Sequence, residues 1–277
     1  MNLTGKELAA AIYTRLKENT SRSTVVFGLE EGTSGILHSK VGGAFYVPEG
    51  MEAPKNTETG EALYLLAQIN FEELPPIEDF PQKGLLQIFI DGKDDTFGCN
   101  FDNEADQTGW RIRFIENLPS AEEIKPEQIR ETEWTEETSL PLDHPVVYRL
   151  TGRREDQPVS INDYRFDEML TKYCSDLLPE GTEGFFDLDD EDAEACEELY
   201  EIFEEYDCQM GGYPTFTQSD PREYMEEDAD VPEILLFQLD TTEDIMWGDS
   251  GVGNFFIKKE DLVKKDFSKV WFNWDCC

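Results

Sequence analysis

The sequence predicts an α+β protein that is mainly β, with internally duplicated antiparallel β units, an N-terminal helix and a helical insert between the copies. Three blocks recur in order: a glycine pair, an apolar run with an internal glutamine, and an apolar run led by glycine. They are Gly42-Gly43, 65–69 and 84–90 in the first half, and Gly211-Gly212, 235–239 and 251–257 in the second. Matching order, spacing and polar amides favour a duplication over chance.

The duplication organises the whole chain. At 277 residues, with 12% aromatic residues, the chain is long and apolar enough for one core shared by two halves. We expect a single pseudo-symmetric domain in four parts: an N-terminal helix with lead-in strands (1–40), repeat copy 1 (41–117), an acidic connection with two helices (118–208) and repeat copy 2 (209–277).

The N-terminal segment carries the start signals of a helix. Thr4 and Glu7 form a T-x-x-E capping box, and Leu3 can pack on Leu8. A stripe of Leu8, Ile12 and Leu16 predicts the buried face.

Residues 24–29 and 34–38 are rich in β-formers and flank a turn at Gly32, so we expect two strands. Copy 1 closes with 110–115, whose alternation puts Trp110, Ile112 and Phe114 on one face of a half-exposed strand.

The connection between the copies has a different character. Prolines and glutamates in 116–143 predict a long surface segment, followed by a strand at 146–150. Helical spacing then runs from Phe166 to Leu177, and again through Ala195, Leu199, Ile202, Phe203 and Tyr206. Twelve acidic residues and no basic residue lie between Asp187 and Asp207.

Copy 2 closes with 269–274, which corresponds to 110–115. Within the repeated strands, Gln87 and Asn254 fall on the same alternating face. Such amides most often satisfy backbone groups at a bulge. The functional alternative is that they line a groove between the halves together with Gln68 and Gln238, since pockets often form where two units meet.

Charge excludes several classes of partner. The chain has 62 acidic and 23 basic residues, a formal net charge of −39, and no dense basic cluster. Nucleic acid and membrane surfaces are therefore not expected partners. A negative field attracts cationic partners, although acidity also serves solubility alone or reflects a saline cytoplasm.

The sequence lacks the signals of a membrane span, of export and of a zinc site. No apolar run approaches the roughly twenty residues of a membrane span, and charges interrupt any export signal. Six cysteines without such a signal predict reduced thiols of a cytoplasmic protein. No C-x-x-C motif and only two histidines argue against zinc, and no cofactor is expected.

Two motifs imitate catalytic or metal sites. Gly248-Asp249-Ser250-Gly251 matches the surroundings of a protease serine, but the chain offers only His38 and His144 as bases, so we expect a tight turn. Asp187, Asp189, Glu191 and Glu198 imitate a calcium loop, yet Asp192 stands where the loop needs glycine. A helix dipole accounts for acidic residues there.

Several strings are similar to the YwqG-like bacterial family. They are Gly211-Gly212-Tyr213-Pro214, Gln218, 235–240, 246–251, 65–70 and 84–90. Ala44 to Pro48 depart from the more compact Gly-Gly-x-Pro pattern of that family. The family is of unknown function, so the resemblance implies a duplicated, mainly β, soluble intracellular fold and no activity.

We therefore predict a non-enzymatic cytoplasmic protein that binds a basic protein partner through its acidic surface, for example as an immunity-like neutraliser. The alternative is a small-molecule hydrolase or transferase with a site between the repeats, around Gln218, Asp220, Trp247 and Asp249. The candidate groove or binding surface comprises Gln68, Gln238, Tyr213, Gln218, Asp220, Trp247 and Asp249. No catalytic or metal-ligating residue is assigned.

Overall fold

The computed structural model describes residues 3–225, 231–242 and 244–277. Its fold is mainly β, as predicted, with ten strands in one antiparallel sheet of order β12-β11-β10-β9-β1-β8-β2-β4-β5-β6. The strands are β1 (Arg22–Glu31), β2 (Lys40–Val41), β4 (Tyr64–Asn70), β5 (Leu85–Ile90), β6 (Trp110–Ile115), β8 (Tyr148–Gln157), β9 (Cys208–Gly211), β10 (Ile234–Asp240), β11 (Val252–Ile257) and β12 (Trp271–Asp275). A separate ribbon pairs β3 (Phe45–Tyr46) with β7 (Ile129–Arg130).

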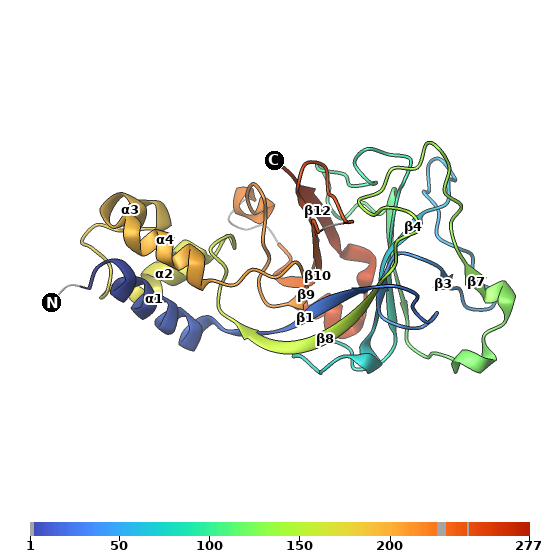
Figure 1. Cartoon of the computed structure of the whole chain (residues 1–277), viewed down its shortest axis with the longest axis horizontal. Helices are drawn as coiled ribbons and strands as arrows, with labels where there is room; N and C mark the ends of the chain where they lie inside the picture. Colours follow the sequence, from blue (N-terminus) through green and yellow to red (C-terminus); the bar gives the residue numbers. More distant parts are fainter. Residues whose placement is uncertain (1–2, 226–230, 243) are drawn as a thin grey trace.

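Most of the helical structure gathers at one end of an elongated molecule (Figure 1). The α-helices are α1 (Gly5–Thr20), α2 (Phe166–Cys174), α3 (Phe185–Glu191), α4 (Ala193–Ile202) and α5 (Lys259–Lys264). Short 3-10 turns are η1 (Phe71–Glu73), η2 (Ala121–Glu123), η3 (Pro126–Gln128), η4 (Pro221–Tyr224) and η5 (Phe267–Lys269). Helices α1 to α4 form what we call the helical lobe, which extends from the ends of β1 and β8.

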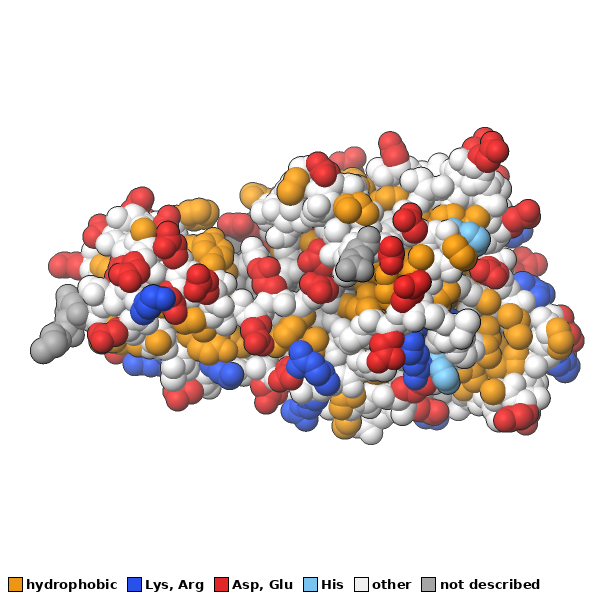
Figure 2. Space-filling view, in the orientation of Figure 1, with side chains coloured by type: hydrophobic (Ala, Val, Ile, Leu, Met, Phe, Trp, Pro, Cys, Tyr) orange, Lys and Arg blue, Asp and Glu red, His pale blue; other side chains and the backbone are white. Residues whose placement is uncertain are grey.

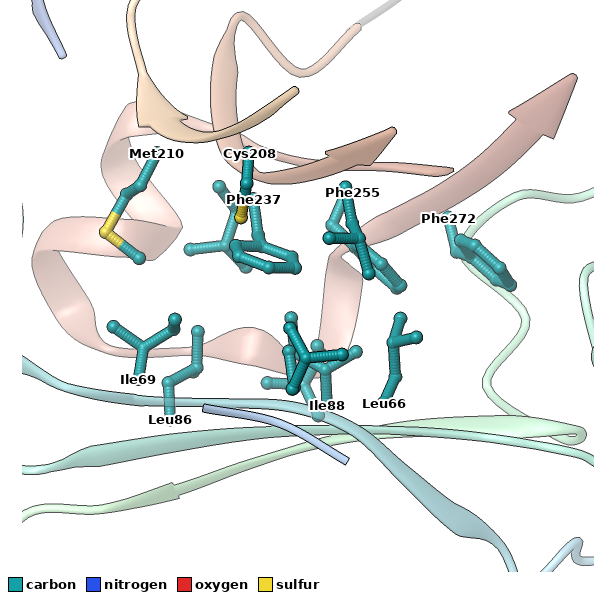
Figure 3. Close-up of a cluster of buried hydrophobic side chains, with 14 of the residues drawn as sticks. Leu66, Ile69, Leu86, Ile88, Cys208, Met210, Phe237, Phe255 and Phe272 are labelled. Carbon is teal, nitrogen blue, oxygen red and sulfur yellow. The ribbon is translucent and has the colours of Figure 1, made fainter. Parts of the chain in front are cut away.

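The two longest strands lie at the middle of the sheet. β1 and β8 pair from Arg22 with Gln157 to Glu31 with Tyr148. The sheet curls about this pair, so that apolar side chains of its two halves meet (Figure 3). Met210 and Phe237 of one half face Ile69 and Ile88 of the other, and all four are fully buried. Removing these side chains from water, at about 25 cal/mol per Å² of apolar area, is the main term that holds the halves together.

The four outer strands on each side of the β1–β8 pair follow one pattern. The first strand group is β2-β4-β5-β6 and the second is β9-β10-β11-β12. Each has a register irregularity at the corresponding place, between Leu65 and Ala67 and between Leu235 and Phe237. The predicted closing strands become β6 and β12, the two edges of the sheet.

A glycine pair ends the first strand of each group. Gly211 and Gly212 have φ of 74° and 69°, a left-handed region that favours glycine. A Cβ at Gly212 would lie 2.2 Å from Gln157 Oε1. Gly42 and Gly43 have the same backbone, with φ of 72° and 75°.

The N-terminal helix forms, and Leu8, Ile12 and Leu16 are buried as predicted. Its cap differs from the prediction, because Thr4 makes no side-chain cap bond. The Gly5 amide instead donates to Asp192 Oδ2, 2.8 Å away on the loop before α4.

The expected strand at 34–38 is wrong. A turn closes there through a bond from the His38 amide to the Gly35 carbonyl, and the Gln68 amide group donates to the carbonyls of Ile36 and His38. These carbonyls are therefore satisfied by side chains rather than by a neighbouring strand.

Three further elements differ from the prediction. The strand expected at 146–150 is β8, which starts at Tyr148 and runs to Gln157 because β1 supplies partners along its whole length. The insert contains α2, α3 and α4 rather than two helices, since Asp192 breaks and recaps the chain between α3 and α4. Helix α5 was not predicted. The surface connection at 116–143 is confirmed, with only η2, η3 and β7 within it.

Candidate functional site

The helical lobe has an apolar core of its own. Leu8, Ile12 and Leu16 of α1 pack with Leu170 of α2 and Leu199 of α4. This cluster is separate from the core of the sheet. The lobe can therefore present an outer surface on helices that are fixed from within.

That outer surface is acidic. Helical spacing turns Leu188, Ala195 and Leu199 inward, which leaves the intervening carboxylates outside. Of the twelve acidic residues from Asp187 to Asp207, all but Asp192 and Glu198 are exposed. We call these twelve residues the acidic run. Figure 2 shows many acidic side chains over the lobe.

Little positive charge compensates the acidic run. Lys6 lies 2.5 Å from Glu198, and that hydrogen bond raises the pKa of Lys6. Among the residues that the structure describes, no other lysine or arginine side chain forms an ion pair with the run. Asp192 acts within the fold, because it accepts from the amides of Gly5 and Ala195. Most of the described carboxylates of the run thus face solvent without a cationic partner.

Two aromatic side chains interrupt this charged surface. Phe186 on α3 is 83% exposed and Tyr200 on α4 is 59% exposed. Tyr200 packs edge-on against Phe185, with ring centroids 5.1 Å apart. Exposed aromatic rings of this kind are enriched at protein interfaces. The sequence analysis missed both residues, although Phe186 precedes the buried Leu188 by two positions and so falls off the buried stripe.

The predicted groove residues occupy separate places. Gln68 and Gln238 are fully buried, one in each strand group. Gln238 accepts from the Thr215 amide at 2.8 Å and donates to the Tyr206 carbonyl at 2.6 Å. The expectation that Gln87 and Asn254 satisfy backbone groups beside a bulge is confirmed, because they donate to the carbonyls of Tyr46 and Thr215.

Tyr213 and Asp220 belong to a buried ionic network. The Arg222 guanidinium lies 2.6 Å from Asp220 and 3.2 Å from Asp163, and Arg165 lies 2.6 Å from Asp163. The guanidinium carbon of Arg165 lies over the Tyr213 ring, 5.3 Å from the ring centroid. This network ties the start of the helical insert to the segment before β10.

Opposite charges control protonation in the network. Burial acts to raise the pKa of Asp163, but the hydrogen bond and charge of Arg165, together with the charge of Arg222, lower it overall. Contact with Asp163 raises the pKa of Arg165 despite its burial. Asp163 and Arg165 therefore stay charged and paired, as expected of an ion pair that stabilises the fold.

Gln218, Trp247 and Asp249 lie near the C-terminus. The backbone amide of Gln218 donates to Asp275 Oδ2 at 2.6 Å, and the backbone carbonyl of Asp249 accepts from the backbone amide of Cys277 at 3.3 Å. The expected tight turn forms, closed by a 2.8 Å bond from the Gly251 amide to the Trp247 carbonyl. Trp247 itself is fully buried. Gln218 and Asp249 are thus brought to one surface region, far in the sheet order from Gln68.

The chemical options of the described residues are narrow. Within residues 3–225, 231–242 and 244–277, no three metal-ligating side chains converge. The segment that imitates a calcium loop, 187–198, lies in α3 and α4. Burial raises the pKa of Cys99 to about 12 and that of Cys174 to about 11, so these thiols are poor nucleophiles. Nor is any helix among the described residues both long and apolar enough to cross a bilayer.

A comparison with models of known protein families gives a match that spans most of the chain. A family described as a domain of unknown function, DUF1963, matches residues 39–276. The chain belongs to the DUF1963 family. The match begins after α1 and β1, so the central strand β1 lies outside the DUF1963 region. A comparison with curated proteins gave no significant match.

Proposed function

We propose that this DUF1963 protein is a non-enzymatic intracellular binding module, and that its acidic helical lobe docks a basic protein partner. The observation that carries the proposal is the acidic run, which is largely exposed and has Lys6 as its one described ion-pair partner. Such a surface attracts cations and raises their association rate.

The two exposed aromatic rings support docking rather than a general effect of charge. Charged rims give orientation and rate, whereas buried aromatic anchors give most of the binding energy. Phe186 and Tyr200 supply such anchors within the acidic surface. A basic partner with an apolar contact point fits this combination. Immunity-like neutralisation of a basic toxin or nuclease is one form of it.

The two strand groups also resemble each other. We propose that the two strand groups descend from one duplicated unit of the YwqG-like kind. Matching irregularities in β4 and β10 support this. So does a matching pair of amide side chains on adjacent strands, which is Gln68 with Gln87 in the first group and Gln238 with Asn254 in the second.

Capture from cell lysate tests the docking proposal. The bait is compared with a lobe variant, Asp190→Asn, Glu197→Gln and Glu201→Gln, in which three exposed carboxylates are neutralised. A matched control neutralises Glu122, Glu127 and Glu136, which are exposed on the surface connection. Both variants lose three charges, so only position differs.

We expect the wild type and the control to retain basic proteins at about 50 mM salt and release them at several hundred millimolar, because salt screens exposed charges. The lobe variant should retain far less. Equal recovery by both variants, or recovery that ignores salt, would argue against docking through the lobe.

A further inference from the structure

A cleft of about 450 Å³ opens where β1, β9, β10 and α5 meet the loop between β4 and β5. It lies at the C-terminal end of α1, whereas the acidic run lies on α3, α4 and the segment after α4. Its charged lining consists of Arg22, Glu78, Asp79, Asp156, Glu233 and Lys259, and Gly211 and Gly212 also line it. The second glycine pair therefore forms part of its wall.

The charges in the cleft favour a cationic ligand. Four carboxylates line it against two basic side chains, Arg22 and Lys259. Lys259 Nζ already lies 2.7 Å from Asp79, and Arg22 donates to the Glu233 carbonyl at 3.0 Å. No lysine or arginine in the described ranges pairs with the carboxylates of Glu78 or Glu233. Glu233 Oε1 accepts from the Lys259 backbone amide at 3.1 Å, but neither carboxylate has a cationic partner within 4 Å among the described residues, so both can receive a positive charge.

A second pocket of about 150 Å³ adjoins the cleft, since Phe80 lines both; apolar side chains make up most of its lining, together with Glu72 and Gln82. Met210 and Val25 come from β9 and β1, and Phe71 and Ile77 come from the segment after β4. The pocket therefore lies between the two strand groups, at the Met210 end of the core in Figure 3. A volume of about 150 Å³ is enough for a benzene-sized group.

We propose that the cleft and the pocket together bind a small organic cation with a compact apolar body. The ammonium group pairs with Glu233 and Glu78, and the apolar body passes Phe80 into the pocket. This arrangement gives both carboxylates a cationic partner and removes apolar surface from water. It uses residues outside the acidic lobe, so it stands independently of the docking proposal.

Phenylalkylamines with one to four methylenes between ring and ammonium are the test ligands, measured by calorimetry or by NMR titration. Matched phenylalkyl alcohols and carboxylates remove or reverse the charge, and methylamine removes the apolar body. We expect at least one amine to bind roughly tenfold or more tightly than its alcohol, because a hydrogen bond to a charged group is worth about 1.5–3 kcal/mol. The carboxylate and methylamine should bind weakly.

Variants locate the site. Glu233→Gln keeps an acceptor for the Lys259 amide, which bonds to Glu233 Oε1 at 3.1 Å, so the fold should persist. Glu78→Gln changes an exposed residue. Each should weaken amine binding several-fold and leave alcohol binding unchanged, whereas Glu31→Gln, an exposed change outside the cleft, should alter neither.

Failure of every amine to bind at millimolar concentration would overturn the proposal. So would equal binding of amine and alcohol, or amine binding that Glu233→Gln and Glu78→Gln leave intact. The lobe variant should bind the amine like the wild type, which separates failure here from failure of the docking proposal.

Discussion

Replacement of Arg222 by methionine tests the buried ionic network most severely. The Arg222 side chain is fully buried, and it bonds to Asp220 and Asp163 and lies 4.2 Å from the ring centroid of Phe256. Methionine keeps the apolar contact but leaves two buried carboxylates short of their partner. Breaking such a pair costs about 3–5 kcal/mol. At roughly 2–4 °C per kcal/mol, the melting temperature should fall by about 6–20 °C at pH 7.

The loss should depend on pH in a definite direction. The folded-state pKa of Asp163 lies below its unfolded value of about 3.9, so its stabilisation is present above about pH 4 and disappears as pH falls through the folded pKa. Arg222→Met removes part of that stabilisation. The deficit of the variant relative to the wild type should therefore be largest near pH 7 and shrink below about pH 4.

Urea unfolding followed by tryptophan fluorescence, repeated from pH 7 to about pH 3.5, measures both effects. Arg154→Met is the control, because Arg154 is exposed and lies 3.7 Å from Asp156; it should change stability by at most about 1 kcal/mol. A deficit of less than about 1 kcal/mol for Arg222→Met, or one of the same size at both ends of the pH series, would refute the reasoning.

Three further outcomes follow from single residues. Gln68→Leu removes the donor to the Ile36 and His38 carbonyls and should destabilise the fold by about 1–3 kcal/mol in urea unfolding; a neutral result would show that these bonds are dispensable. Burial raises the pKa of Asp240 to about 6, so its charge opposes folding increasingly from about pH 4 to pH 6. Asp240→Asn should therefore raise the melting temperature at pH 7 but not at about pH 4, and an equal change at both would contradict this. Phe186→Ser, at a site 83% exposed, should alter stability by less than about 0.5 kcal/mol yet reduce partner capture, and undiminished capture would count against the aromatic anchor.

The sequence predicted those parts of the fold that local pattern controls. Apolar runs at 65–69 and 84–90, with their counterparts in the second half, became β4, β5, β10 and β11. The stripe of α1 was also correct. The strand predicted at 34–38 was wrong. Its residues have a β-forming composition, but the side-chain amide of Gln68 in β4, about thirty positions away, bonds to their carbonyls instead.

Long-range pairing set the rest of the fold. The ten-residue match of β1 to β8 joins segments more than a hundred positions apart, and no local signal specifies it. The curl that places Met210 near Phe71 follows from that pairing, so neither the cleft nor its apolar pocket could be predicted. Asp220 looked available for chemistry although its ion-pair partner Arg222 is only two positions away, because the second carboxylate on that arginine, Asp163, is distant in sequence.

Site-specific crosslinking tests docking through the acidic lobe most directly. A photoreactive amino acid replaces Phe186, which is 83% exposed on the lobe, or Met51, which is 58% exposed outside it. After irradiation in cells, we expect adducts to basic proteins from position 186 that the lobe variant abolishes, and few from position 51. Adducts of equal amount and identity from both positions, or adducts from position 186 that persist in the lobe variant, would contradict it.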